Sequence, residues 1–534
     1  MTRRLFSLAL ALAVCSAEAG SPAVMKPGGT DATPRVLSAL ERLQDGGVLR
    51  FERGEYRFLS GDARRMRLDP SNNASGEKHV IFPLVGRRNV TVDGGGSRFV
   101  FGPGAFPFAI LRSEGIVLKG FSVECEVAPY VSGTVVADDG KGFVFRVDAG
   151  SAQMDLSQRH ISLHGIDRQR QCFYRAPNDP EPADWIPTRF MCFSPEARGG
   201  GTWYMRYADD PSPKCVRGYY ASGERVAFNL SGNRDRVFCF AEDARDLSLE
   251  DVRIVNFGGM GVLAQRSEDI TLVRYVALPA EGRPVTLTAD AAHFVNCRGR
   301  VRLEDCELSW GLDDVCNVHG NYLEVTGASG HDAELRIGHF EQRGFMPYRV
   351  GDAVEFIERR RRSVLCKAKV TAARLLAPDR VRITVDAILD GVPAGALVED
   401  VTACPDVVIR NCRFHDYPHL RLSGRGRMLV EDCSFRRSAV GIFAYDLAEY
   451  WYESGRIADL TIRNNIFEGC NVRGDGVSPA IRIGLTGWKP GDEDMPLIHG
   501  TVRLQGNVFR NCGERACEAY GVKDCQCKDG NHEK

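Results

Sequence analysis

The hexapeptide LEDCEL, from Leu303 to Leu308, contains the pattern that decides the fold. An apolar residue comes first, then any residue, then Asp, Asn or Gly, a small or buried residue, any residue and a second apolar residue. Six further copies are LKGFSV (Leu118–Val123), LEDVRI (Leu249–Ile254), IRNCRF (Ile409–Phe414), VEDCSF (Val430–Phe435), IRNNIF (Ile462–Phe467) and LQGNVF (Leu504–Phe509). Successive copies begin 21 residues apart at Ile409 and Val430. A short strand, a turn and a second strand at this period predict a right-handed parallel β-helix.

The length and the glycine content of the chain agree with a stack of such coils. The chain has 534 residues, more than one ordinary hydrophobic core supports, and 56 glycines suit a fold with many turns. The alternative is an antiparallel β-sandwich in which the hexapeptides resemble one another by chance.

The 69 Lys and Arg residues nearly balance 70 Asp and Glu residues, which argues against a nucleic-acid-binding or basic membrane-surface protein.

Two stretches interrupt the repeat and predict inserted domains. Residues 126–240 and 322–404 lack the hexapeptide and contain strand-like runs instead, such as GTVVADDGKGFVFRV, in which DGKG suits a hairpin turn. We therefore expect an all-β protein with two small antiparallel β-barrel or β-sandwich insertions. Its β-helix would comprise residues 20–125, 241–321, and 405–534 with a cysteine-containing tail.

The N-terminus predicts two further features. In residues 1–19, Arg3 and Arg4 precede an apolar run and small residues, which is the pattern of a signal peptide. The apolar run is too short to span a bilayer, and no later stretch is apolar enough to do so. The alternative to a cleaved signal peptide is a lipoprotein anchored at Cys15. We expect an exported protein, periplasmic or extracellular. After the predicted signal peptide, Thr33 is predicted to cap a short amphipathic helix that covers the open end of the β-helix.

The 18 cysteines suggest disulfides, yet three of them occupy one position of the hexapeptide. Cys306, Cys412 and Cys433 fall where later copies have Asn465 and Asn507. A position shared by Cys and Asn is typical of a stacked ladder inside the coils, so we expect buried, reduced thiols there. The candidates for a disulfide are the cysteines of the C-terminal tail: Cys517, Cys525 and Cys527.

The densest group of polar residues lies between the two insertions. Asp290, in TADAAHF, precedes Asp313 and Asp314, in GLDDVCNVHG, by about one coil, the first of the pair being 23 residues away. Three carboxylates should therefore lie together on one face of the solenoid, where repulsion keeps at least one protonated to higher pH. Glycoside hydrolysis requires such a carboxylic acid beside a carboxylate. The alternatives are a solvated turn and a calcium site.

These motifs, with TDATP, VTVDGGG (Val90–Gly96) and WYESGRI (Trp451–Ile457), make the chain resemble glycoside hydrolase family 110, the bacterial exo-acting α-1,3-galactosidases. An Asp one coil before an Asp-Asp pair also resembles the polygalacturonase arrangement. The family resemblance implies a β-helix with two barrel insertions and an inverting removal of terminal α-1,3-linked galactose, with no metal and no cofactor. It implies that Asp290, Asp313 and Asp314 form the catalytic group. Which of the three is the acid is left open by the sequence, but the adjacency of Asp313 and Asp314 favours one of these two, because repulsion raises one of their pKa values.

Five residues near these motifs are predicted to contact substrate: His293, Asn317, His319, Glu453 and Trp310. Each has a structural alternative, such as a ladder position, an ion pair or a place in the core. The expected partner is a galactose-containing oligosaccharide or glycoconjugate. The sequence leaves open a preference for branched blood-group B or linear α-1,3-galactosides.

Three other functions fit the same pattern. They are a polygalacturonase-like hydrolase, a calcium-dependent polysaccharide lyase and a non-catalytic β-helix that binds glycans. The first two act on acidic polymers and would require a basic cleft near the aspartates, for which Arg298, Arg300 and Arg302 are available.

Overall fold

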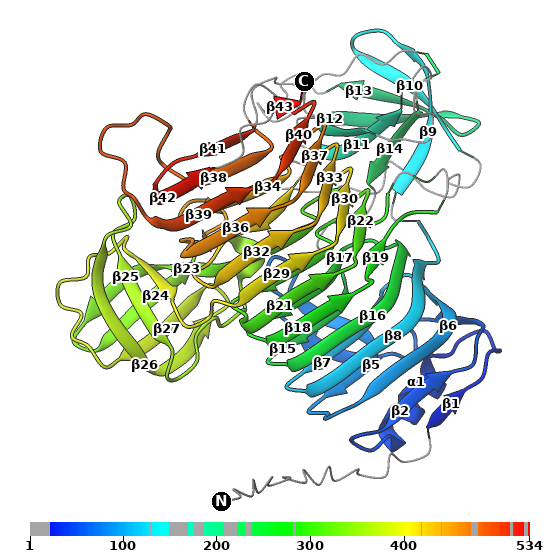
Figure 1. Cartoon of the computed structure of the whole chain (residues 1–534). Helices are drawn as coiled ribbons and strands as arrows, with labels where there is room; N and C mark the ends of the chain where they lie inside the picture. Colours follow the sequence, from blue (N-terminus) through cyan, green and yellow to red (C-terminus); the bar gives the residue numbers. More distant parts are fainter. Residues whose placement is uncertain are drawn as a thin grey trace, which may run out of the picture.

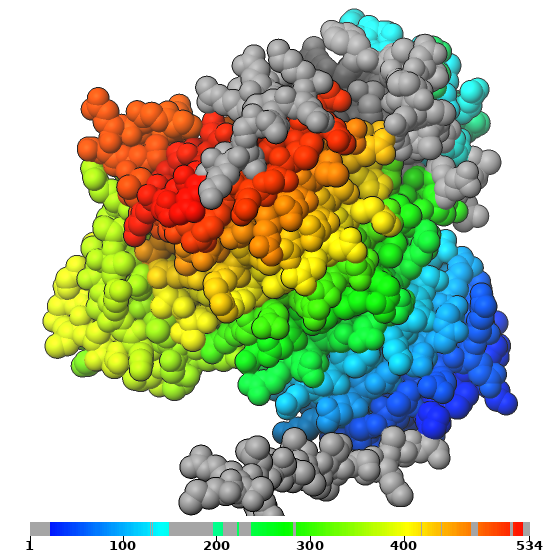
Figure 2. Space-filling view, in the orientation of Figure 1, coloured from blue at the N-terminus to red at the C-terminus, as the bar shows by residue number. Residues whose placement is uncertain are grey.

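The computed structural model describes residues 22–128, 130–148, 169–175, 186–207, 222–223, 225–229, 236–280, 283, 285–417, 419–438, 440–470, 479–512, 516–527 and 532–533. The predicted signal peptide, residues 1–19, lies outside these ranges. Nearly every described element is a β-strand, and parallel pairing builds a long stack of coils (Figure 1). The predicted all-β parallel β-helix is therefore confirmed. Figure 2 shows the coils as coloured bands that follow one another in sequence order.

One long face of the stack, sheet A, is a parallel sheet whose strands pair coil by coil. Its strands are β1 (Ala23–Met25), β2 (Val48–Phe51), β3 (Glu55–Phe58), β6 (Thr91–Phe101), β8 (Glu114–Cys125), β16 (Arg245–Asn256), β18 (Glu268–Val273), β19 (Val276–Ala277), β21 (Arg298–Glu304), β22 (Glu307–Ser309), β29 (Asp406–Arg410), β30 (Arg413–His415), β32 (Arg427–Glu431), β33 (Ser434–Arg436), β36 (Asp459–Arg463), β37 (Ile466–Glu468), β39 (His499–Gln505), β40 (Val508–Arg510), β42 (Val522–Cys527) and β43 (His532–Glu533).

The hexapeptides lie on sheet A, and their third residue makes the bend between two short strands. The backbone angle φ there is +55° at Asp251, +54° at Asp305, +53° at Asn411 and +67° at Gly506. Asp, Asn and Gly adopt this left-handed conformation more readily than other residues. The repeat therefore favours these three residue types at the bend, although Arg274 makes the same bend between β18 and β19 with φ +49°.

The Cys and Asn residues of the hexapeptides form the predicted ladder inside the coils. The backbone N–H of Cys412 donates to Sγ of Cys433 at 3.4 Å, and that of Cys433 donates to Oδ1 of Asn465 at 2.9 Å. Asn465 in turn donates from its backbone N–H and from Nδ2 to Oδ1 of Asn507, at 3.1 and 2.9 Å. Cys306, Cys412 and Cys433 are buried and form no disulfide, so the prediction of buried, reduced thiols is confirmed.

The cysteine tail continues the stack. In sheet A, β42 pairs in parallel with β39, which sets Cys525 opposite Val502 and Cys527 opposite Leu504. Cys517 lies on another strand, opposite Ile481. The side chain of Cys527 lies outside the described residues, so the disulfide among the tail cysteines stays a prediction.

A second face, sheet B, carries the candidate site. Its strands are β4 (Arg64–Leu68), β5 (Gly76–Val85), β7 (Ala105–Leu111), β15 (Val237–Glu242), β17 (Met260–Gln265), β20 (Ala292–Val295), β23 (Cys316–Ser329), β31 (Leu420–Leu422), β34 (Ile442–Asp446), β38 (Ile481–Leu485) and β41 (Cys517–Ala519). Several of these strands, β7, β17 and β20 among them, are buried on both faces because other segments cover their outer side.

Each interruption of the repeat contains an antiparallel sheet (Figure 1). The first is a closed barrel of β9 (Tyr130–Asp138), β10 (Gly142–Val147), β11 (Gln169–Arg175), β12 (Ile186–Gly199), β13 (Thr202–Tyr207) and β14 (Arg225–Asn229). In the second, β23 continues out of the stack and joins β24 (Asp332–Ile337), β25 (Ala353–Ile357), β26 (Val364–Ala377), β27 (Arg380–Val385) and β28 (Leu397–Asp400). This second sheet has its own apolar core, which includes Leu335, Phe356 and Ile383.

The helix α1 (Thr33–Arg42) lies at the N-terminal end of the stack and packs Val36 and Leu40 into the main core. Thr33 is its first helical residue and Ala32 is the N-cap, so the prediction that Thr33 caps the helix is wrong. The Thr33 hydroxyl donates to the backbone carbonyl of Leu59 at 3.1 Å instead. In the described part of the chain, no helix is long and apolar enough to cross a membrane.

Candidate active site

Asp290 and the Asp313–Asp314 pair lie on adjacent coils. The backbone N–H of Ala291 donates to the carbonyl of Asp314 at 3.0 Å. In the next residues of the two coils, His293 pairs with Asn317. One coil here is therefore one residue longer than the 23 residues that separate Asp290 from Asp313 in the sequence. Asp290 consequently lies level with Asp314 rather than with Asp313. The expected proximity of the three aspartates is present.

The polar residues that follow these aspartates point away from the coil interior. On β20 and β23, Phe294 and Val318 face the apolar core, so the neighbouring His293, Asn317 and His319 face outward. All three are nevertheless buried, with exposed fractions of 0%, 2% and 3%. Their outer side must therefore be covered by other parts of the chain.

Two segments provide part of this cover. The short strand β35 (Glu453–Ser454) runs antiparallel to β23 and sets Glu453 opposite Asn321. The residues before β5 also reach the site, because Nδ2 of Asn72 donates to Oε1 of Glu453 at 3.1 Å. The backbone N–H of Ser71 donates to Oε1 of Gln265 at 2.7 Å and ties the same segment to β17.

A line of three side chains connects the coils at Asp290. Oδ2 of Asp290 lies 2.5 Å from Nδ1 of His293, and Nε2 of His293 lies 2.9 Å from Nε2 of His319. Nδ1 of His319 lies 2.8 Å from the carbonyl oxygen of Gly320. Burial lowers the pKa of His319 to about 4, so this imidazole is neutral at pH 7.

Basic side chains lie against the other acids. Nε2 of His419 is 2.9 Å from Oδ1 of Asp314, and Nε of Arg421 is 3.9 Å from Oδ2 of the same residue. Nη2 of Arg421 is also 2.6 Å from Oε2 of Glu453. The aspartate Asp314 and the glutamate Glu453 thus share one buried arginine.

The aspartates also act on the groups beneath them. Burial, with a further contribution from the negative charges of Asp290 and Asp313, raises the pKa of Tyr417 well above its usual value. Burial and the charges of Asp290 and Asp314 do the same to the pKa of Cys316. Both groups therefore remain protonated at neutral pH and serve as uncharged walls of the site.

The structure brings together most, but not all, of the predicted site residues. Asp290, Asp313, Asp314, His293, Asn317, His319 and Glu453 form one connected group. Trp310 packs instead in an apolar cluster with Tyr130, Val285 and Leu312, and 6% of its surface is exposed. Trp310 thus borders the start of the first inserted barrel.

The sequence reasoning did not select His419, Arg421 or Asn72. His419 and Arg421 lie on the coil after the second insertion, where Arg421 pairs with Asn317 in the parallel sheet. Aligning LRL (Leu420–Leu422) with CNV (residues 316–318) would have identified Arg421, because the two segments pair as neighbouring strands. No sequence signal connects Asn72 to this site.

The arginines considered for an acidic polymer lie elsewhere. Arg298 forms an ion pair with Asp352 of the second insertion. Arg300 and Arg302 line a hollow of about 530 Å³ on sheet A, where Glu304, Asp406 and other charged residues accompany them. They therefore make no basic cleft beside the aspartates.

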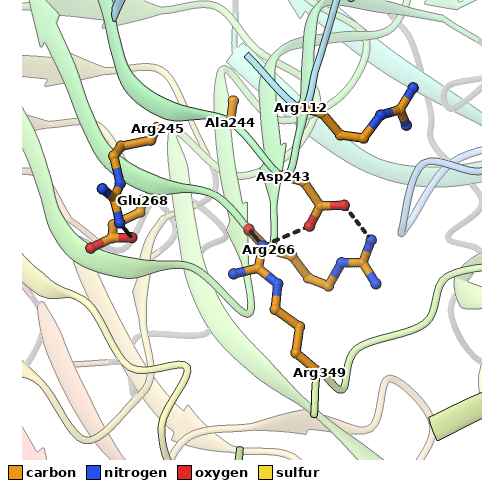
Figure 3. Close-up of a pocket in the computed structure, with 7 residues that line it drawn as sticks. All are labelled: Arg112, Asp243, Ala244, Arg245, Arg266, Glu268 and Arg349. Carbon is orange, nitrogen blue, oxygen red and sulfur yellow. Dashed lines mark hydrogen bonds and ion pairs between the residues drawn. The ribbon is translucent and has the colours of Figure 1, made fainter. Parts of the chain in front are cut away.

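A second hollow, of about 460 Å³, lies at the edge of the coils (Figure 3). It is lined by Arg112, Asp243, Ala244, Arg245, Arg266, Glu268 and Arg349. Asp243 holds Arg266 and Arg349, each with an N···O distance of 2.6 Å, while Arg245 lies 3.1 Å from Glu268. Its charges are thus largely paired among themselves.

Among the residues that the structure describes, no group of three or more His, Cys, Asp or Glu side chains is arranged to hold a metal ion. At the candidate site, histidine and arginine nitrogens lie against the acids instead. A solenoid with buried aspartates on one face, and histidine and arginine side chains beside them, defines a candidate carbohydrate-active enzyme.

Comparison with known proteins gives the family. No protein-family model matches the chain. Alpha-1,3-galactosidase A of Shewanella woodyi is 30% identical over 525 residues, covering 91% of this chain and 81% of that protein. Alpha-1,3-galactosidases A and B of Bacteroides thetaiotaomicron are 26% and 25% identical, covering 83% and 90% of this chain and 78% and 80% of theirs. The protein is a glycosidase. It belongs to the α-1,3-galactosidase family.

Solved structures resemble the chain more distantly. A polygalacturonase of Erwinia carotovora ssp. carotovora has a TM-score of 0.40 at 8% identity, with 96% of this chain and 98% of that chain covered. A family 28 exopolygalacturonase of Yersinia enterocolitica has a TM-score of 0.33 at 10% identity, with 96% and 76% covered.

Proposed function

We propose that this protein removes terminal α-1,3-linked galactose from glycans by an inverting, metal-independent hydrolysis that uses Asp290, Asp313 and Asp314. The observation that carries the proposal is the proximity of the three acids on adjacent coils, joined by the hydrogen bond from Ala291 to Asp314. The names of the relatives supply the substrate, a galactose-containing oligosaccharide or glycoconjugate.

The partners of the acids suggest their roles. His293 lies against Asp290, and His419 and Arg421 lie against Asp314, so these two aspartates are favoured as carboxylates. Asp290 and Asp314 are 1% and 4% exposed, whereas Asp313 is partly exposed. We assign Asp313 as the acid, because it carries the remaining carboxyl group and is the most accessible to a leaving sugar.

In the proposed step, Asp313 donates its proton to the glycosidic oxygen while the bond from that oxygen to C1 of galactose breaks. A water molecule held by Asp290 and Asp314 forms the new bond to C1 from the opposite face and gives its proton to one of these carboxylates. An inverting enzyme needs about 6.5–9.5 Å between acid and base to admit that water.

The surrounding side chains suit a neutral sugar. Oδ1 of Asn317 is buried and has no hydrogen-bond partner among the described residues, so a sugar hydroxyl is a fitting donor for it. His293, His319 and Glu453 lie in the same connected group of residues as Asn317 and the aspartates. The histidine and arginine nitrogens lie where a cation would need ligand oxygens, which favours a reaction without metal.

The test assays a p-nitrophenyl α-galactoside, α-1,3-galactobiose and polygalacturonate in parallel, with and without EDTA. We expect galactose release that survives EDTA and falls by at least about a thousandfold in Asp313→Asn. Asp290→Asn and Asp314→Asn should also lose most of the activity. The matched control is Asp432→Asn, an exposed turn position at φ +56° where other coils carry Asn. Activity on polygalacturonate alone, or only with calcium, would overturn the proposal.

Two further measurements test the proposed inversion and the proposed export. Proton NMR of the first product should show β-galactose, since inversion changes the anomeric configuration, and α-galactose would contradict inversion. Export is tested by fractionating the native host: we expect a mature chain that begins near residue 20 and is absent from the cytoplasm.

A further inference from the structure

The hydrogen-bonded line from Asp290 through His293 to His319 restricts where protons can be. All three side chains are at least 97% buried, and each contact is short: 2.5 Å between Asp290 and His293, and 2.9 Å between the two histidines. In such a buried chain each nitrogen must be either a donor or an acceptor, because water is not there to exchange roles.

The end of the line at His319 fixes the first proton. Nδ1 of His319 lies 2.8 Å from the carbonyl oxygen of Gly320, which can only accept, so Nδ1 carries a hydrogen. Burial keeps the ring neutral, since it lowers the pKa of His319 to about 4. Nε2 of His319 therefore has a lone pair, and Nε2 of His293, 2.9 Å away, must donate to it.

The contact between His293 and Asp290 then fixes the second proton. A lone pair on Nδ1 cannot face a carboxylate lone pair at 2.5 Å, so one hydrogen lies between these atoms. Histidine binds a proton more tightly than aspartate, with ordinary pKa values of about 6.5 and about 3.9. The hydrogen therefore belongs to Nδ1, unless the surroundings reverse this order.

The surrounding charges do not reverse it. In the turn before β23, Asp314 lies level with Asp290, so its charge and that of the adjacent Asp313 favour a cation at His293. Glu453 on β35 lies against the other histidine, with Oε1 3.6 Å from Nε2 of His319, and the burial of His319 outweighs the Glu453 charge there. Opposing them are Arg421 on β31 and, when protonated, His419 beside it. Both of these lie against acids of their own, Asp314 and Glu453.

We propose that His293 is an imidazolium with a hydrogen on both ring nitrogens and is the counter-ion of Asp290, and that His319 is a positioning residue that holds this state by accepting from Nε2. The structure thereby resolves the repulsion among three neighbouring carboxylates: one negative charge is neutralised by a buried cation. This inference rests on the proposed function only for its effect on catalysis, which is to keep Asp290 available as a carboxylate.

The protonation state can be measured without any substrate. Neutron diffraction from deuterium-exchanged crystals of the wild-type protein should show deuterium on both nitrogens of His293 and only on Nδ1 of His319. Deuterium on Oδ2 of Asp290 in place of Nδ1 of His293, or on Nε2 of His319, would overturn the proposal.

The catalytic effect is tested with a matched pair of variants. His319→Gln keeps an acceptor for Nε2 of His293, whereas His319→Leu removes it. In the leucine variant His293 loses its proton more readily and Asp290 is protonated more easily. The acidic limb of kcat/KM should then move to higher pH by about one to two units. The glutamine variant should keep the limb near its wild-type position.

Equal shifts in both variants, or no shift in the leucine variant, would contradict the positioning role of His319. If His319→Leu does not fold, as judged by circular dichroism, the neutron measurement decides. If the wild type hydrolyses no galactoside at all, the proposed function fails while the neutron result still decides the proton positions.

Discussion

Nε2 of His419 lies 2.9 Å from Oδ1 of Asp314, although the whole second inserted domain separates the two residues in the sequence. The parallel pairing of β23 with β31 closes this gap, because the coil resumes beneath Asp314 once the insertion ends. The insertion therefore leaves the stack of coils intact, and the candidate site spans both sides of it.

His419→Ala should lower kcat on an α-galactoside by up to about a hundredfold, since Asp314 loses the side chain that orients it. The KM should change much less, because the interaction is with the carboxylate and not with the sugar. The control is His415→Gln, since His415 is half-buried on sheet A against Asp416 and Glu307. Equal losses in both variants would show that the effect is on folding.

The buried pair of Arg421 and Glu453 predicts a different outcome, in stability. Arg421→Met leaves the carboxylate of Glu453 buried without its arginine, at a cost of about 3–5 kcal/mol of unfolding free energy. Adding Glu453→Gln should recover much of that loss, because the uncompensated charge is then absent. Thermal melting of the two single variants and the double variant measures this coupling. Additive losses would contradict it.

The sequence predicted sheet A well for a physical reason. Its coils bend at residues with positive φ, such as Asp305 and Asn411, and this conformation favours Asp, Asn or Gly. A bend with such a residue preference leaves a visible repeat. The inward apolar residues on either side of it complete the hexapeptide.

Sheet B leaves no such repeat, and this explains which site residues were missed. All seven residues of β7 and all six of β17 are buried, so the alternation of polar and apolar residues that marks a half-exposed strand is lost. Asp290 and Asp314 could be related through coil length alone. Asn72 reaches the site only because a distant segment folds over the outer face.

The ladder inside the coils makes a further prediction. Asn465→Ala removes the acceptor for the backbone N–H of Cys433 and the donor to Asn507, which should cost about 2–3 kcal/mol. Asn465→Cys should cost less, because a cysteine already accepts the same backbone N–H one coil earlier, at Cys433. Thermal melting compares the two variants. An equal loss in both would show that volume, and not hydrogen bonding, determines this position.

Buried neutral histidines predict how stability depends on pH. His499 accepts from the backbone N–H of Ile457 at Nδ1, 3.2 Å away, and its Nε2 lies 2.9 Å from the carbonyl of Gly484. Burial lowers the pKa of His499, as it lowers that of His319 to about 4. Below about pH 6.5 the unfolded chain therefore binds more protons than the folded one, and stability falls as pH decreases.

The melting temperature should accordingly drop between pH 6.5 and pH 4, with up to about 1.4 kcal/mol per pH unit from each such histidine. In His499→Asn the slope over this range should be shallower, even if the melting temperature at pH 7 is lower, because one group that resists protonation is gone. His331→Gln, at an exposed position on the second insertion, should keep the wild-type slope. An unchanged slope in His499→Asn would show that the acid sensitivity arises from other groups.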